Sequence, residues 1–358
     1  LLSEIPDAMR FDLLDPDEQL ELNKNPNVLR ERLAARPDTP TVIIDEIQRV
    51  PRLLDVVQSL IDRNRALRVI LSGSSARKLR HGHSNLLGGR IRCLSLHPLT
   101  AAELGDSAAL NQTLAYGSLP RICLELEARA NDEARGLLKS YVTTYLREEI
   151  KAEALVRSFH GFQSFLDVAA AQFAQQVNFS AVSRECHVAY ATVREFYSIL
   201  EDTLVGFFLL PHSGSVRRRM SLAPKFYFFD NGVTRAISGT LAAPPGAIER
   251  GRLFEQWFVQ EVRRLNDYLD KDFRLSFWRT SHGAEVDLIV ERTGEAPAAF
   301  ECKSSAGIGA ADLTGLKAFQ NVVPEARLHL VAPVKEPRRI GDVDVLPPLS
   351  ALRMIEGF

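Results

Sequence analysis

The sequence predicts a multidomain α/β protein, and two observations carry this prediction. Between Pro6 and Leu104, apolar runs of strand length alternate with amphipathic stretches of helical period, which is typical of a parallel sheet covered on both faces. Beyond the Gly/Pro-rich segment 238–246, a second pattern of helix, three strands, helix and strand follows. The chain has 358 residues, of which 46% are hydrophobic, so it can fill more than one core.

Composition and charge exclude several classes of protein. The longest apolar runs, 204–210 and 226–229, are strand-sized and fall short of the roughly 18 residues that cross a bilayer, so no membrane partner is expected. The 44 basic and 45 acidic side chains exclude a globally basic nucleic-acid binder but allow local basic patches. No CxxC pair occurs, so we expect free thiols and a cytoplasmic protein, with four separate cysteines at Cys93, Cys123, Cys186 and Cys302.

Residues 1–105 are expected to form the first domain, built on a parallel sheet. Its expected helices lie around 27–34 and 51–62, and its expected strands are Met9–Leu14, Thr41–Ile44, Leu67–Leu71 and Ile91–Leu96. The chain opens at Leu1 without a methionine, and Leu1–Ile5 has the pattern of a helix end. We therefore expect an upstream segment to be missing.

Two acidic residues, Asp45 and Glu46, directly follow the buried strand Thr41–Ile44. They stand at the carboxyl end of a parallel strand, where α/β sheets bind ligands. This is the arrangement of a Walker B motif, in which the first acid serves Mg²⁺ and the second polarises the attacking water. The next strand ends in Ser72–Ser75, small hydroxyl residues placed to sense a γ-phosphate. We expect nucleotide chemistry at this edge; acidic loop residues without a function are the alternative.

In these motifs the chain resembles the AAA-type ATPases of bacteria and archaea that carry a C-terminal restriction-endonuclease-like domain of unknown function. The shared segments extend over nearly the whole chain and are Ile43–Gln48, Ser72–Ser75, Gly88–Arg90, Pro98–Glu103 and the lid motif Tyr116–Pro120. The resemblance implies ATP as a cofactor, with Asp45 serving Mg²⁺ and Glu46 as catalytic base. It also implies Ser74 as a sensor and Arg90 as an arginine finger, although a surface arginine that caps a loop is an equal interpretation of Arg90.

The sequence departs from this family at the phosphate-binding loop. No G-x-x-x-x-G-K-[ST] occurs in the 358 residues, so the phosphates have no backbone cradle. Because the family places this loop just before the helix that ends at Leu1–Ile5, residues 1–105 are expected to be a truncated AAA, P-loop NTPase-like core that does not hydrolyse ATP alone. Residues 106–155, which are helical in pattern, are expected to form its helical lid.

Residues 156–240 have the element order of a winged helix. Two helices, the second at Tyr190–Leu200, precede strands at 204–210 and 225–230. The intervening segment and the residue that follows it carry four cations and no acid, which suits contact with the phosphates of DNA: Arg217, Arg218, Arg219 and Lys225. A solvated loop in a protein–protein adaptor is the alternative.

Residues 246–358 are expected to form the second α/β domain. The expected elements are a helix at 249–269, strands at 274–280, 285–290 and 298–304, a helix at 312–321 and a strand at 327–332. This order resembles the core of the PD-(D/E)xK nucleases, which implies a restriction-endonuclease-like fold.

The acidic residues of this part lie where such a fold needs them. Glu301 and Lys303 share one strand face because side chains alternate, and Asp287 can oppose them from the neighbouring strand. Glu255 in the first helix can add a further acid. Carboxylate oxygens suit Mg²⁺, so Glu255, Asp287 and Glu301 are the expected metal ligands, and Lys303 can orient the attacking water. A salt-bridged sheet edge and a nuclease fold used only for binding remain alternatives.

The sequence therefore predicts an ATP-dependent protein that acts on nucleic acid, with phosphodiester hydrolysis at Asp287, Glu301 and Lys303. The alternative is an ATP-switch regulatory or interaction protein whose nuclease-like domain is non-catalytic and docks a protein partner. Assembly into a homo-oligomer is compatible with both. The presence of a divalent cation at Asp287 and Glu301 would separate the two interpretations.

Overall fold

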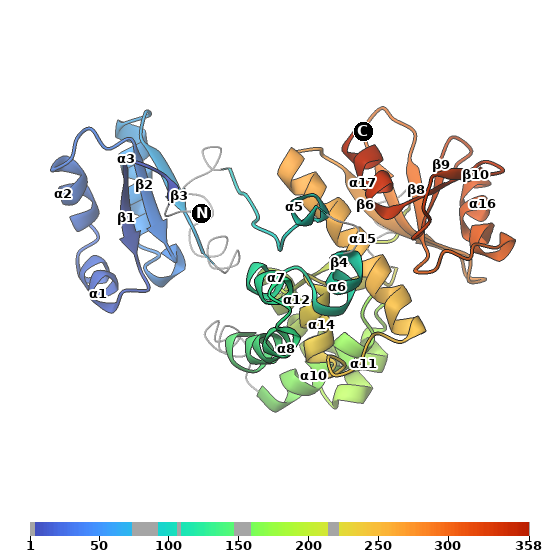
Figure 1. Cartoon of the computed structure of the whole chain (residues 1–358). Helices are drawn as coiled ribbons and strands as arrows, with labels where there is room; N and C mark the ends of the chain where they lie inside the picture. Colours follow the sequence, from blue (N-terminus) through green and yellow to red (C-terminus); the bar gives the residue numbers. More distant parts are fainter. Residues whose placement is uncertain (1–3, 74–91, 106–108, 147–158, 214–221, 358) are drawn as a thin grey trace. The chain divides into compact units, whose positions relative to one another are not determined.

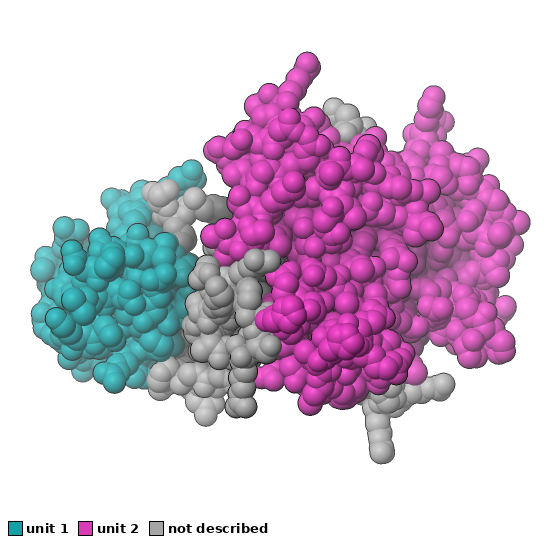
Figure 2. Space-filling model, turned by 90° about the horizontal axis from the view of Figure 1, so that it is seen from below, with its two compact units in different colours: residues 1–93, 202–204 teal, residues 94–201, 205–358 magenta. Residues whose placement is uncertain are grey.

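The structure is a computed structural model, and it describes residues 4–73, 92–105, 109–146, 159–213 and 222–357. The chain divides into two compact units (Figure 2). Unit 1 comprises residues 1–93 with 202–204, and unit 2 comprises residues 94–201 and 205–358. None of the helices in the described ranges is both long and apolar enough to cross a membrane.

Unit 1 contains a three-stranded parallel sheet in the order β1-β2-β3 (Figure 1). The strands are β1 (Ala8–Asp12), β2 (Thr41–Asp45) and β3 (Arg68–Leu71). The helices are α1 (Pro16–Lys24), α2 (Val28–Ala34) and α3 (Leu53–Arg63), with a 3₁₀ turn, η2 (Ile47–Arg49). The middle strand is apolar and buried, which confirms the expected parallel sheet and mixed α/β character.

Two details of unit 1 differ from expectation. Helix α1 was not foreseen, although Asp15 accepts hydrogen bonds from the backbone N–H groups of Asp17 and Glu18 and a proline occupies the first turn, which is a strong helix start. The strand expected at 91–96 is absent from residues 92–96, which have no regular structure; Ile91 lies outside the described residues. Its apolar run was too short to establish a strand, and residues 92–96 are exposed.

The first half of unit 2 is helical and ends in a β-hairpin. Its helices are α5 (Ala101–Leu104), α6 (Ala109–Tyr116), α7 (Pro120–Glu127), α8 (Asn131–Ser140), the π-helix η3 (Tyr141–Leu146), α10 (Phe159–Ala171), α11 (Phe179–Cys186) and α12 (Tyr190–Asp202). Strands β4 (Gly206–Leu209) and β5 (Lys225–Phe228) pair antiparallel, and α14 (Asn231–Ile237) follows. Aromatic rings join the helices to the hairpin, as between Tyr197 and Phe226 at 4.8 Å.

The second half of unit 2 is a six-stranded sheet in the order β10-β11-β9-β8-β7-β6 with helices on both faces (Figure 1). Its strands are β6 (Arg274–Arg279), β7 (Glu285–Glu291), β8 (Ala298–Cys302), β9 (Arg327–Val331), β10 (Arg338–Ile340) and β11 (Val343–Leu346). Its helices are α15 (Ala247–Leu269), the 3₁₀ turn η4 (Ala310–Leu313), α16 (Thr314–Gln320) and α17 (Pro348–Glu356). The expected helix, meander, helix and strand are present, whereas β10, β11 and α17 were not foreseen.

The two faces of this sheet are covered by different helices. Leu288 and Phe300 face α15 and α17 and join the large core that continues into the helical half of the unit. Ile289 faces the other way and packs with Leu316 and Phe319 of α16. Alternation puts Asp287 and Glu301 on the opposite side of their strands from Leu288 and Phe300. Contacts with Lys225 of β5 nevertheless hold Glu285 and Asp287 of β7 beside the first half of unit 2.

The segment 238–246, expected as an interdomain linker, is a loop tied into unit 2. The buried Arg235 guanidinium donates to the backbone oxygens of Thr240 at 2.6 Å and Ala243 at 2.5 Å, and to Glu249 at 2.9 Å. The glycines and prolines correctly indicated a loop, but they carry no information on which groups bind its backbone.

Candidate functional site

Two acids stand at the carboxyl end of the sheet in unit 1, as the sequence predicted. Asp45 Oδ1 is hydrogen-bonded to the Ser72 hydroxyl, which also accepts from the backbone N–H of Glu46 at 3.3 Å. Glu46 has a left-handed backbone (φ 58°), and its Oε2 accepts from Gln48 Nε2 at 2.6 Å. A Cβ on Gly73 would collide with the Gln48 side chain, so glycine leaves room for it. Ser72 and Gln48 were not singled out individually from the sequence.

Two residues predicted to complete this nucleotide site, Ser74 and Arg90, lie outside the described residues. Arg217, Arg218 and Arg219 of the hairpin lie outside them as well. Their expected roles stay predictions.

The segments 98–103 and 116–120, whose motifs resembled those of the ATPase family, bind to α14 and α15 within unit 2. The Asp230 carboxylate accepts from the Ser118 N–H at 2.7 Å, and Gly117 (φ 76°) has no room for a side chain beside it. Arg264 donates to the Leu99 oxygen at 3.0 Å and to Glu261 at 2.7 Å. We call Leu99, Ser118, Asp230, Glu261 and Arg264 the interlock. It gives both motifs a structural role.

Four carboxylates gather where β7, β8 and α15 meet; we call Glu255, Glu285, Asp287 and Glu301 the carboxylate cluster. The register pairs Leu288 with Phe300, so Asp287 and Glu301 are the next facing positions of the two strands. Asp287 Oδ2 accepts from the Cys302 N–H at 2.9 Å. Glu301 Oε1 accepts from Lys303 Nζ at 2.9 Å, whereas its buried Oε2 has no hydrogen-bond partner. Asp287, Glu301, Lys303 and Glu255 thus lie together, and Glu285 joins them unforeseen.

Lys225 lies at the centre of this cluster and not on an exposed wing. Its side chain is 3% exposed, and its ammonium lies 2.5 Å from Glu285, 2.6 Å from Glu255 and 3.5 Å from Asp287. This corrects the prediction that Lys225 contacts DNA phosphates, because the three carboxylates already surround its charge. The prediction grouped Lys225 with the three arginines that precede it in the sequence. In the structure, strand β5 instead directs the Lys225 side chain toward Glu255 of α15.

Burial dominates the electrostatics of the cluster. It raises the pKa of Glu255 to about 7, and Asp287 adds to this rise. Burial, again with Asp287, raises the pKa of Glu301 well above its usual range. For Lys225 burial alone would lower the pKa, but Glu255 and its neighbours outweigh this and raise it well above the ordinary value. The lysine therefore stays charged.

The cluster does not fit a divalent metal in this arrangement. A hard cation such as Mg²⁺ or Ca²⁺ needs several oxygens at about 2.0–2.6 Å from a common point. Among the described residues, no group of three or more His, Cys, Asp or Glu side chains could hold a metal ion. The ammonium of Lys225 instead stands among three of the acids. This is at odds with the predicted metal site at Glu255, Asp287 and Glu301.

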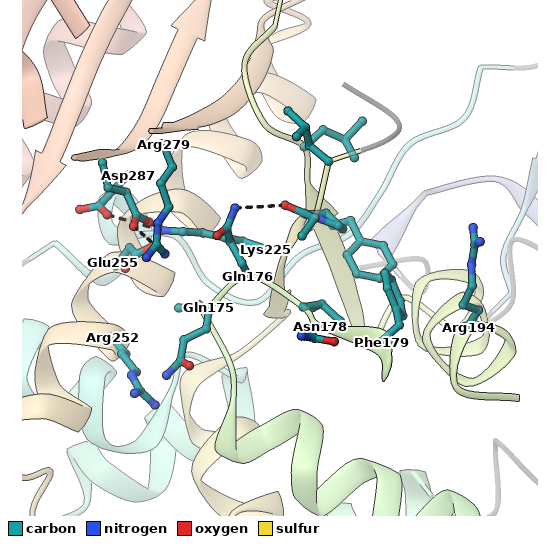
Figure 3. A pocket seen from close by; sticks show the side chains of 18 of the residues that line it. Gln175, Gln176, Asn178, Phe179, Arg194, Lys225, Arg252, Glu255, Arg279 and Asp287 are labelled. Carbon is teal, nitrogen blue, oxygen red and sulfur yellow. Dashed lines mark hydrogen bonds and ion pairs between the residues drawn. The ribbon is translucent and has the colours of Figure 1, made fainter. Parts of the chain in front are cut away.

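The cluster opens into a groove of about 1460 Å³ within unit 2. At one end lie Lys225, Glu255, Asp287 and Arg279, and at the other lie Phe179 of α11 and Arg194 of α12 (Figure 3). The guanidinium of Arg194 lies 5.8 Å from the centre of the Phe179 ring. One groove therefore connects the helix pair of the first half of unit 2 with the acids of the sheet.

Comparisons with known proteins support a nucleotide-binding class for the parallel sheet of unit 1. Residues 2–105 match the family model of an AAA domain, which supports an AAA-type ATP-binding protein. Residues 107–243 and 250–352 match two domains of unknown function, DUF8612 and DUF4143.

The chain is similar to two curated mycobacterial proteins. These are the uncharacterized protein Rv2008c of Mycobacterium tuberculosis and the uncharacterized protein Mb2031c of Mycobacterium bovis. Each is 29% identical over 315 residues, which cover 87% of this chain and 69% of the relative. No solved structure gives a significant match.

Proposed function

We propose that this chain belongs to an ATP-dependent protein that acts on nucleic acid. In this proposal unit 1 supplies the nucleotide-dependent step, with Asp45 serving Mg²⁺ and Glu46 acting as the base. Unit 2 supplies a winged-helix arrangement and a restriction-endonuclease-like domain. The match of residues 2–105 to an AAA domain supports the ATP-dependent part.

The observation that supports the nucleic-acid part is the shared groove. Helices α11 and α12 and the hairpin β4–β5 form one wall, while the acids of α15, β7 and β8 form another. Arg194 on the helical wall offers a guanidinium beside an aromatic ring, a combination that suits phosphates and stacked bases. The three hairpin arginines that precede β5 add further cations to the same segment.

DNA binding by the chain tests this proposal. Replacing Arg217, Arg218 and Arg219 by Ala should weaken binding uniformly across sequences and reduce its salt dependence, because fewer counterions are released. Arg194→Ala should act in the same direction, whereas exposed Arg353→Ala on α17, outside the groove, should not. Fluorescence anisotropy across a salt series measures both effects. Equal salt slopes in all variants would assign the helix–hairpin segment to a protein-docking role.

The second candidate is a regulatory or interaction protein in which the nuclease-like domain does not cut. A specific observation favours it: Lys225, rather than room for a metal, is at the centre of the carboxylate cluster. A cleavage assay on linear, circular and single-stranded DNA and on RNA, comparing the chain with its Asp287→Asn variant, separates the candidates. Cleavage that this variant loses supports a nuclease, whereas no cleavage of any of these substrates by either chain supports the second candidate.

A further inference from the structure

We propose that the Lys225 ammonium is the resident cation of the carboxylate cluster, and that Lys225 and a divalent metal exclude each other there. The inference concerns how the site is controlled. It rests on the proposed function only for its bearing on cleavage, because metal uptake can be measured without any nucleic acid.

The geometry of Lys225 is that of a built-in counter-ion. Its ammonium lies 2.5 Å from Glu285 and 2.6 Å from Glu255. Lys225 belongs to β5, whereas Glu285 belongs to β7 and Glu255 to α15. The Lys225 side chain is almost fully buried, and its Nζ lies 5.4 Å from the centre of the Phe277 ring. A buried ion pair of this kind persists only when each charge has its partner.

Strand β5 holds the lysine in place. The backbone N–H of Phe228 donates to Gln256 at 3.0 Å, and its oxygen accepts from Gln260 at 2.6 Å. Tyr227 donates its hydroxyl to Glu255. Glu255 belongs to α15, and the strand that carries Lys225 is hydrogen-bonded to the same helix. The packing of β5 on α15 therefore determines the position of the ammonium.

The charges of the cluster explain why a metal and Lys225 compete. Four carboxylates face three cations: Lys225, Lys303 bonded to Glu301, and Arg279, which lies 3.2 Å from Glu285. Adding a divalent ion beside the ammonium would place like charges a few ångströms apart in a partly dehydrated site, which is unfavourable. Removing the ammonium leaves Glu255, Glu285 and Asp287 short of positive charge and frees oxygens that suit a hard cation.

Titration of Mn²⁺ into the full chain tests this inference. Wild type should take up no Mn²⁺ in the millimolar range, whereas Lys225→Met, which keeps an unbranched side chain one atom shorter and removes its charge, should bind at least tenfold more tightly. Lys303→Met is the matched control: it removes one cation from the same cluster, but from its edge, and should gain no comparable affinity. Equal affinity in wild type and Lys225→Met overturns the inference, and so does equal gain in the two methionine variants.

Thermal unfolding supplies the second measurement, because Lys225→Met could fail to fold. Mn²⁺ should raise the melting temperature of Lys225→Met and leave that of wild type unchanged. If this variant does not fold even with Mn²⁺, Lys225→Gln, which removes the charge but keeps a hydrogen-bond donor for the acids, decides. A folded Lys225→Gln variant that takes up no more Mn²⁺ than wild type overturns the inference. Absence of DNA binding by wild type would instead count against the proposed function, and it would leave the Mn²⁺ result unchanged.

Discussion

The Tyr227 hydroxyl donates to Glu255 Oε1 at 2.6 Å, the same oxygen that the Lys225 ammonium contacts at the same distance. One carboxylate oxygen thus receives two donors from alternate residues of β5. The carboxylate of α15 is oriented by the hairpin before any ligand arrives.

Tyr227→Phe should lower the free energy of unfolding by about 1.5–3 kcal/mol, the usual value for a hydrogen bond to a charged group. The ring, stacked on Phe207 at 5.6 Å, would remain, so the loss reports the hydroxyl alone. Denaturant unfolding measures the change. Tyr190→Phe, at a half-exposed ring, should stay within about 0.5 kcal/mol of wild type. Equal effects at the two tyrosines would mean that the bond to Glu255 contributes nothing.

Stability should fall as the pH rises from about 4.5 to about 7, through the titration of Glu255. Its pKa is raised to about 7 in the folded state, so the folded protein binds this proton more tightly than the unfolded chain does. The contribution of Glu255 to the free energy of unfolding is therefore fully present below its pKa in the unfolded chain. It is lost as the pH rises through its pKa in the folded protein, by about 3 kcal/mol at most.

The comparison for this pH effect is Glu255→Gln, which cannot titrate. Its stability should change less than that of wild type between pH 5 and 8 in denaturant unfolding at each pH. Glu301, whose pKa is also raised, leaves a residual slope of the same sign. Parallel pH profiles for wild type and Glu255→Gln would contradict the assignment.

Arg264→Met should destabilise unit 2 by about 3–5 kcal/mol, because it leaves the buried Glu261 carboxylate without its cation. Adding Glu261→Gln should restore part of this loss, which a double-mutant cycle measures. Exposed Arg353→Met serves as the control and should change little. A double variant that is no more stable than Arg264→Met would show that the ion pair is not the source of the effect.

Glu46→Gln should abolish ATP turnover and leave nucleotide binding intact, in a protein that joins this chain to a phosphate-binding loop. Glutamine keeps the shape of the side chain and its contact with Gln48 but cannot accept a proton from water. Steady-state turnover and equilibrium nucleotide binding check the two halves of this prediction. Gln48→Ala, which removes only the partner of Glu46, should reduce turnover less. Full activity of Glu46→Gln would remove Glu46 from the role of base.

The regular elements could largely be predicted from the sequence because their signals are local. The apolar run 41–44 became the middle strand β2, and the two-residue spacing of Glu301 and Lys303 placed their side chains in hydrogen-bonding contact. The facing positions of Asp287 and Glu301 followed from a short connection between adjacent strands. Periodicity and alternation need no knowledge of distant residues.

The contacts between segments far apart in the chain could not be predicted. Lys225 pairs with Glu255, 30 residues on, and its position after three arginines indicated a solvated hairpin. Nothing in the motif at 116–120 indicated that Asp230, 112 residues after Ser118, binds its backbone. Such partners depend on how elements pack, and a single sequence carries no record of that packing.

The interlock also has a consequence for how the chain is made. Leu99 receives its hydrogen bond from Arg264, 165 residues later, and Ser118 receives one from the same guanidinium. At a synthesis rate of about 5–20 residues per second, a ribosome needs roughly 8–30 s to deliver the arginine after the leucine has emerged. During that interval, segments 98–103 and 116–120 lack the partners that complete their burial. A nascent chain that stalls before α15 should therefore be the form most exposed to proteases and chaperones.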